Sequence, residues 1–274
     1  MGDLEHGEGF STRRIAGLEV LSAGTASDRP PLLLVHGAWH GAWCWTRHFM
    51  PYLADAGWAV HALSLRGHGG SAGGSLNRLR LRDYADDVAA VTAELGPAVL
   101  VGHSMGGAVV QRLLCRADRP AVVAGALLAS VPPRGVIRIT TQVAREEPAV
   151  FAMANLTADL GRLVASPEQV RNLFLSDDAD DGLVASVHQR VQKESYLAFL
   201  GMLTPHRPRS RPDLPVFVLG AADDRIFTPS EVKATAAAWN TSAHLVPGLA
   251  HDVMLDTRWR EAADRLLGWL DGVT

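Results

Sequence analysis

The sequence predicts an α/β fold in which a doubly wound, mostly parallel sheet carries a helical cap. From residue 13 onward, short apolar runs alternate with amphipathic stretches of helical period. The runs are apolar at nearly every position, which suits strands that are covered on both faces. One long stretch, residues 131–212, interrupts the alternation because it contains no convincing buried strand. Crossover units around a parallel sheet explain the alternation, and an inserted cap explains the interruption.

The strands of the predicted sheet follow one another along the chain. An early apolar stretch at 13–21 can add antiparallel edge strands. Six buried strands are then predicted at 31–37, 57–65, 97–104, 123–130, 214–220 and 242–248. Their order along the chain sets the order in which loops and helices leave the sheet.

Helices are predicted at 82–95, 106–117, 228–239 and 257–270. The first repeats apolar residues at intervals of three and four and stops at Gly96 and Pro97. The third begins with Thr228, Pro229 and Glu231, which are favourable residues for a helix start. These helices supply the crossovers between the predicted strands.

The chain is expected to form one core domain from residues 13–130 and 213–274. The inserted cap, residues 131–212, reads as several short amphipathic helices and ends in a basic, proline-rich connector. Residues 1–12 are acidic and glycine-rich, and we expect them to form a disordered tail. The insertion is expected to lie over the ends of the sheet strands.

Composition and charge exclude several classes of function. Of 274 residues, 47% are apolar, and the net charge is −3 with no long block of one sign. We therefore expect no nucleic-acid partner and no polybasic membrane anchor. No run of about 18 apolar residues is present, and the N-terminus has no apolar signal region. The sequence predicts a cytoplasmic enzyme that contacts no membrane, with a homodimer left open.

A candidate nucleophile lies at Ser104, within the pattern G-x-S-x-G formed with Gly102 and Gly106. A predicted strand runs into this serine and a predicted helix runs out of it, which is the context that the pattern requires. In a tight strand–turn–helix junction, the residues two before and two after the serine have to be small. The helix that starts at Met105 directs its free N–H groups toward any charge that forms there.

A serine nucleophile needs a base and a group that orients the base, and these follow it in the order acid, then histidine. His251 lies in a glycine-containing loop after the last predicted strand and is our candidate base, whereas His244 lies inside that strand. Asp223 and Asp224 both follow the fifth buried strand. We favour Asp224 as the acid and keep Asp223 as the alternative.

The negative charge of an ester-hydrolysis intermediate needs two backbone N–H donors. The expected donors are Met105, which follows the nucleophile, and Ala38, which follows the first buried strand. His36 and His40 have a spacing found in metal sites. They lie on a loop rather than a helix, however, and no glutamate stands beside either. The sequence therefore predicts no metal and no organic cofactor.

Several motifs together resemble the α/β-hydrolase superfamily, in family order: "VHGAWHGAWCW", "LRGHGGS", "GHSMGG", "VLGAADDRI" and "GLAHDVM". The resemblance implies a doubly wound sheet with a helical cap over the site, and it supports Asp224 over Asp223. The first motif looks most like the branch of methylesterases and hydroxynitrile lyases. Gly37 and Asp252 stand where the lyases of that branch carry threonine and lysine, which favours the esterase side. An acidic Asp252 beside the site is also expected to disfavour cyanide or carboxylate leaving groups.

The sequence thus predicts a serine hydrolase that cleaves a carboxylic ester of a small, largely apolar substrate through an acyl-enzyme. The alternatives are a cofactor-free oxygenase or perhydrolase, a C–C lyase on the same scaffold, and a non-catalytic small-molecule receptor. An apolar substrate pocket can be formed by large side chains of the cap and the first loop, each of which can equally be core packing. The candidates are Trp39, Phe151, Met153, Phe174, Phe199 and Met202.

Overall fold

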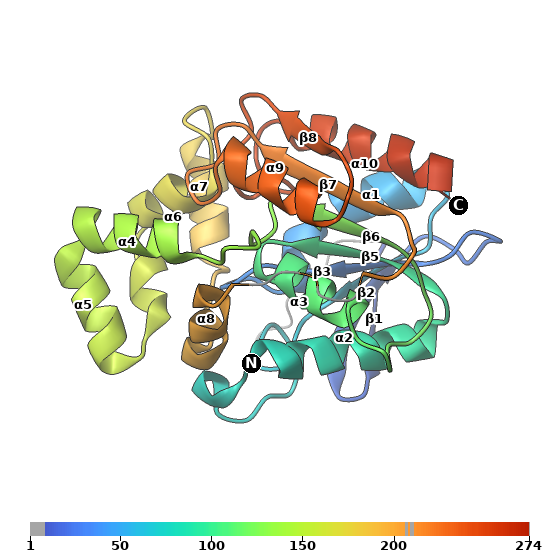
Figure 1. The fold of residues 1–274 in the computed structure, drawn as a ribbon, viewed down its shortest axis with the longest axis horizontal. Coiled ribbons are helices and arrows are strands. Elements are labelled where there is room, and N and C mark those ends of the chain that lie inside the picture. Colours follow the sequence, from blue (N-terminus) through green and yellow to red (C-terminus); the bar gives the residue numbers. More distant parts are fainter. Residues whose placement is uncertain (1–8, 206–207, 209–210, 274) are drawn as a thin grey trace.

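A computed structural model describes residues 9–205, 208 and 211–273 of the chain. It contains one eight-stranded sheet in the order β1-β2-β4-β3-β5-β6-β7-β8 (Figure 1). Only the pairs β1–β2 and β2–β4 are antiparallel, and every other pair is parallel. The predicted doubly wound, mostly parallel sheet is confirmed.

Strands occur where all six apolar runs predicted them, each somewhat shorter than its run, but the last of them lies at the edge of the sheet and is only partly buried. Parallel strands inside the sheet are covered on both faces, so their side chains are apolar at nearly every position. The strands are β1 (Ser11–Ile15), β2 (Leu18–Ala23), β3 (Leu32–Val35), β4 (Val60–Leu63), β5 (Ala98–His103), β6 (Val122–Leu128), β7 (Val216–Ala221) and β8 (Ala243–Val246).

Helices cover both faces of the sheet. Figure 1 shows α1 and α10 on one side of the sheet and α2 and α3 on the other. The capping box of α9 forms as its start signals predicted, because Thr228 and Glu231 each bond to the other's backbone N–H. The helices of the core are η1 (Ala42–Trp45), α1 (Phe49–Asp55), η2 (Leu76–Arg78), α2 (Leu81–Leu95), α3 (Met105–Leu114), α9 (Pro229–Ala238) and α10 (Trp259–Val273).

A group of short helices separates β6 from β7 along the chain and lies together at one end of the molecule (Figure 1). They are α4 (Ile137–Glu146), α5 (Pro148–Thr157), η3 (Leu160–Val164), α6 (Pro167–Phe174), α7 (Asp181–His188) and α8 (Tyr196–Leu203). We call this group the cap. None of the helices in the described part of the chain is both long and apolar enough to span a membrane.

The prediction that residues 1–12 form a disordered tail is wrong for the last two of these residues. Ser11 and Thr12 belong to β1 and pair with Ser22 and Leu21 of β2. Backbone pairing along a sheet edge orders this segment although its side chains are polar. Residues 1–8 lie outside the described residues, as do 206–207 and 209–210 of the predicted connector.

The strand order places a reversal at the centre of the sheet. From β3 the chain moves outward to β4, and then it returns to place β5 on the other side of β3. In open α/β sheets, ligands bind at the carboxyl ends of the strands beside such a reversal. Val35 of β3 pairs with Gly102 of β5, so the two loops that follow these strands lie side by side.

Candidate active site

Ser104 occupies a strained turn between β5 and α3. Its φ of 51° and ψ of −116° lie in a region that residues with a side chain seldom adopt. The surrounding backbone holds this conformation. Its N–H donates to the carbonyl of Leu128 at 3.0 Å, and its own carbonyl accepts from Ala108 and Val131 at 3.2 and 3.3 Å. Strain of this kind costs about 1–3 kcal/mol and persists only where its neighbours enforce it.

The glycines around this turn are required by space. A Cβ on Gly102 would lie 2.5 Å from the carbonyl oxygen of Gly106. A Cβ on Gly106 would collide with the carbonyl oxygens of Val35 and His36. Gly37 is equally confined, because a Cβ there would lie 2.8 Å from His103 Nδ1 and 3.0 Å from Ser104 Cβ. Both glycines of the motif, and Gly37 of the neighbouring loop, therefore allow the backbone to approach Ser104 closely.

His251 reaches Ser104 from the loop that follows β8. The Nε2 atom of His251 lies 2.9 Å from Ser104 Oγ. The Nδ1 atom lies 2.8 Å from Asp224 Oδ2, and since a carboxylate only accepts, Nδ1 carries the proton. This tautomer leaves the Nε2 lone pair free to accept the serine proton. The ring of Phe227 packs edge-on against His251, with a centroid distance of 5.4 Å.

Asp224 is fixed by the turn that follows β7. Its Oδ1 atom accepts the backbone N–H groups of Ile226 and Phe227 at 2.7 and 3.0 Å. The other oxygen is thereby directed at His251. Asp223 is exposed and makes no such contact with the ring in the described structure, although its N–H donates to Leu249 at 3.1 Å. The geometry places Asp224 and not Asp223 beside the histidine.

The loop after β3 presents Ala38 beside Ser104, and both residues line one cavity. The carbonyl of Gly37 accepts from His36 Nδ1 at 2.7 Å and from the N–H of His40 at 3.4 Å. In a trans peptide the N–H points opposite to the carbonyl, so the Ala38 N–H points away from these histidines. Met105 is the first residue of α3, where the N–H has no acceptor within the helix.

The cavity above Ser104 has a volume of about 350 Å³ and a mostly apolar lining. Four of the predicted pocket residues line it: Trp39, Phe151, Phe199 and Met202. Two do not. Met153 lies two positions along α5 from Phe151, roughly half a turn around the helix, and is 42% exposed. Phe174 is buried behind the site, where it stacks on His251 and meets His40 edge-on.

A buried ion pair behind the site was not expected from the sequence. His40 Nε2 lies 3.0 Å from Asp252 Oδ2, and both side chains are fully buried. Burial disfavours the charged ring, but the charge and hydrogen bond of Asp252 outweigh it and raise the pKa of His40. Asp252 therefore faces a cation rather than the cavity. Asp252 is not among the residues that line the cavity, and the expectation that it disfavours anionic leaving groups stays a prediction.

His36 and His103 complete the group of rings around the site. The two nitrogens of His36 bond to the carbonyl of Gly37 and the N–H of Leu65. Burial lowers the pKa of His103 to about 3, so this ring stays neutral, and its Nε2 donates to the carbonyl of His251 at 2.9 Å. These bonds hold the loops of the site together and leave His251 as the ring that contacts Ser104.

Comparison with known proteins identifies the family of this chain. A family model described as the alpha/beta hydrolase family matches residues 32–265. The pyrethroid hydrolase of Sphingobium wenxiniae is 30% identical over 210 residues, which are 72% of this chain and 71% of that enzyme. Methylesterase 18 of Arabidopsis thaliana is 25% identical over 224 residues, 76% of this chain and 84% of that protein.

The fold of the whole chain is similar to that of a solved structure. An esterase from a Rhodococcus species has a TM-score of 0.69 at 20% identity, covering 97% of this chain and 99% of that one. The doubly wound sheet and the strained serine turn define a class of hydrolases. This chain belongs to the alpha/beta hydrolase family, and it is a hydrolase of the carboxylesterase-like type. Methylesterases are among its relatives, as the sequence motifs indicated.

Proposed function

We propose that the protein is a serine esterase that cleaves an uncharged carboxylic ester through an acyl-enzyme on Ser104. One observation carries the proposal. Ser104, His251 and Asp224 form a continuous hydrogen-bonded chain, with contacts of 2.9 and 2.8 Å, at the floor of an apolar cavity. A nucleophile, a base and a group that orients the base are the components that covalent ester hydrolysis requires.

The reaction begins when His251 Nε2 takes the hydroxyl proton of Ser104 as Oγ bonds to the ester carbonyl carbon. The carbonyl oxygen becomes an oxyanion, which the N–H groups of Ala38 and Met105 bind. When the bond to the alcohol breaks, His251 returns its proton to the leaving alkoxide and the acyl group stays on Ser104. Water then attacks the acyl group by the same steps, releasing the acid and restoring the serine.

The cavity favours a substrate with one sizeable apolar group. Its walls carry side chains such as Val136, Ile139 and Phe227 from both the cap and the core. The charged side chains of the lining are Glu146, Glu147 and Arg225, all at exposed positions. The guanidinium of Arg225 is paired with the carboxylate of Asp177 at 2.6 Å, so its charge is offset. An anionic substrate would meet these carboxylates as it entered, so an uncharged ester fits the site better.

The decisive experiment compares the wild-type chain with Ser104→Ala. Hydrolysis of p-nitrophenyl acetate is expected to fall by about 10⁴-fold or more, since a triad acts as a unit. A fluorophosphonate probe is expected to label the wild type and not the variant. Ser75→Ala, at an exposed position, serves as the control and should behave like the wild type. Equal turnover by folded Ser104→Ala would overturn the proposal, and wild-type protein without turnover or labelling would point to a receptor.

A further inference from the structure

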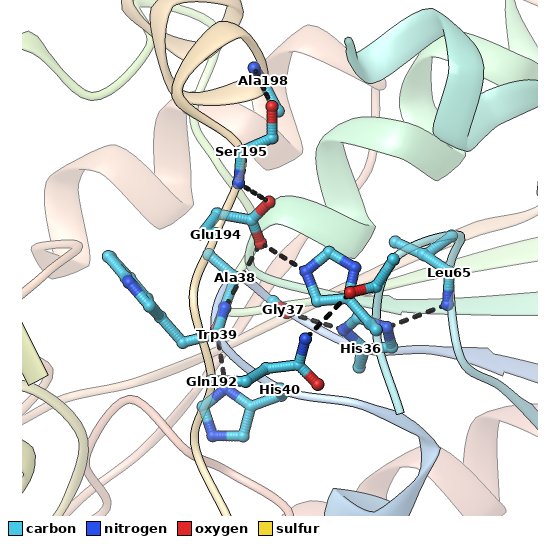
Figure 2. A network of polar contacts seen from close by, with 12 residues as sticks. His36, Gly37, Ala38, Trp39, His40, Leu65, Gln192, Glu194, Ser195 and Ala198 are labelled. Carbon is cyan, nitrogen blue, oxygen red and sulfur yellow. Dashed lines mark hydrogen bonds and ion pairs between the residues drawn. The ribbon is translucent and has the colours of Figure 1, made fainter. Parts of the chain in front are cut away.

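A short connector of the cap, residues 192–195, lies against the loop that carries Ala38. Figure 2 shows Gln192 and Glu194 of this connector beside Trp39 and Ala38. The backbone N–H of Gln192 donates to the carbonyl of Trp39 at 2.9 Å. The carboxylate of Glu194 accepts the N–H of Trp39 at 3.3 Å. Two backbone groups of one loop residue are thus held by the cap.

Glu194 is a buried carboxylate with a full set of donors. Its Oε2 atom accepts from Trp39 and from His68 Nε2, the latter at 3.0 Å. Its Oε1 atom accepts from the hydroxyl of Tyr84 at 3.1 Å and from the N–H of Ser195 at 2.6 Å. Only 1% of its surface is exposed. The backbone N–H groups of Trp39 and Ser195 can only donate, and each meets a different oxygen of Glu194. A carboxylate therefore matches them, whereas the NH2 group of an amide would face an N–H at either position.

His68 supplies the opposite charge. Its Nδ1 atom lies 3.2 Å from the carbonyl of Arg66 and its Nε2 atom faces Glu194, so both ring nitrogens meet acceptors. A ring that donates from both nitrogens is an imidazolium. A buried pair of this kind is costly to break, since removing one partner leaves the other charge unpaired. The ion pair therefore fixes the position of the Glu194 carboxylate.

Trp39 requires such support because its backbone is strained. Its φ of 64° lies in the left-handed region, which favours glycine. Besides the two backbone contacts, its indole N–H donates to the carbonyl of Leu160 in the cap at 3.1 Å. The carbonyl on the other side of the Ala38–Trp39 peptide accepts from His40 Nδ1 at 2.7 Å. Glu194 and His40 thus hold the two polar ends of a single peptide plane.

We propose that Glu194 is a positioning residue for the oxyanion hole. By holding the Ala38–Trp39 peptide, it sets the direction of the adjacent Ala38 N–H toward the place where charge develops. This role rests on the proposed esterase function, in which Ala38 is one oxyanion donor. The cap then does more than cover the cavity, because one of its residues helps to complete the reactive site.

The test compares Glu194→Gln with Asp87→Asn in the full-length chain. Asp87 is also a buried carboxylate; it bonds to Arg66, whose carbonyl meets His68, but in the described structure it makes no bond to Glu194 or to the loop of Ala38. Three quantities are measured: kcat and KM for a p-nitrophenyl ester, the inhibition constant of an aryl trifluoromethyl ketone, and the unfolding temperature. The ketone adds to Ser104 and forms an oxyanion, so its affinity reports on the oxyanion hole, whereas KM reports mainly on the cavity.

For Glu194→Gln, we expect kcat to fall by about 10- to 100-fold and the inhibition constant to rise by the same factor. KM should stay within about twofold of the wild type. Asp87→Asn should lower only the unfolding temperature. A Glu194→Gln variant with wild-type kcat and inhibition, or one in which kcat and KM change as they do in Asp87→Asn, would overturn the proposal.

Glu194→Asp keeps the experiment decisive if Glu194→Gln does not fold. Aspartate retains the negative charge but withdraws the acceptor oxygen from both Trp39 and His68 by one methylene. The same joint loss of kcat and ketone affinity supports the positioning role, and wild-type values refute it. Ser104→Ala separates the two proposals. If Ser104→Ala is active, the esterase function fails. If it is inactive while both Glu194 variants resemble the wild type, only the role of Glu194 fails.

Discussion

Two adjacent aspartates illustrate how much depends on a single position along the chain. Asp224 is buried, accepts two backbone N–H groups and contacts His251. Asp223 is exposed. The turn after β7 directs the one side chain inward and the other outward, so a shift by one residue exchanges a candidate catalytic group for a solvated one.

This difference makes a direct prediction. Asp224→Asn should lower kcat by about 10⁴-fold, because an amide that donates to Nδ1 would favour the wrong tautomer of His251. Asp223→Asn should leave kcat within about twofold of the wild type. Steady-state hydrolysis of a p-nitrophenyl ester measures both values. If Asp223→Asn proved the more damaging substitution, the acid would have to be reassigned to Asp223.

The residues that the sequence could and could not identify differ in a physical way. Ser104 and His251 stand in local patterns, a glycine-bounded turn and a loop after the last strand, that are visible in a few letters. Glu194 has no local signal. Its partner His68 is 126 positions away, and the meaning of both depends on how the cap folds back onto the core. The pairing of His40 with Asp252, 212 positions apart, was hidden for the same reason.

At the scale of elements, α5 shows that the position of a residue around a helix, and not its apolar character alone, determines whether it faces the cavity. Phe151 lines the cavity, whereas Met153 on the same helix is 42% exposed. Successive residues of an α-helix are rotated by about 100°, so positions two apart face nearly opposite ways. Both were candidates from the sequence because both are large and apolar. The α5 stretch is apolar on more than one side, and its pattern therefore did not reveal which side meets the cavity.

A pair of substitutions in α5 tests this assignment. Phe151→Ala should raise KM for an ester with a bulky apolar group by about 10-fold, since it removes apolar contact worth about 1–3 kcal/mol. It should have little effect on p-nitrophenyl acetate, whose acyl group is small. Met153→Ala is the matched control and should leave KM unchanged for both esters. Equal effects of the two substitutions would mean that α5 presents a different face to the substrate.

At the scale of the molecule, the fold brings together groups from the ends of four strands. Ser104 follows β5, Asp224 follows β7, His251 follows β8 and the loop of Ala38 follows β3. The sequence predicted this convergence because parallel strands end at one edge of the sheet. The apolar runs in the sequence predict where strands occur, and the helical crossovers between them predict that the strands are parallel. The packing of the cap depends on contacts between distant segments, so its exact arrangement does not follow from local pattern.

The histidines of the whole molecule predict how stability depends on pH. Burial lowers the pKa of five of them below 6.5: His36, His48, His61, His103 and His244. Between pH 6.5 and the lowered pKa of each folded ring, the unfolded chain binds a proton that the folded chain does not, so stability rises with pH toward 6.5. The pKa values of His40 and His68 are raised despite burial, because each ring is paired with a carboxylate. Their stabilisation is complete below 6.5 and is lost as pH rises through their folded pKa values.

We therefore expect the unfolding temperature to be highest near pH 6.5, to fall steeply toward pH 5 and to fall more gently toward pH 8. The fall is steeper on the acid side because five rings with lowered pKa values destabilise the fold there, whereas only two rings with raised pKa values do so on the alkaline side. The half-buried rings among the five each contribute less. Calorimetry at pH 5, 6.5 and 8 measures the profile. His61→Gln should flatten the acid side, since the pKa of His61 is lowered to about 4 and glutamine carries no proton to exchange. A wild-type chain that unfolds at a higher temperature at pH 5 than at pH 6.5 would contradict the assigned charge states.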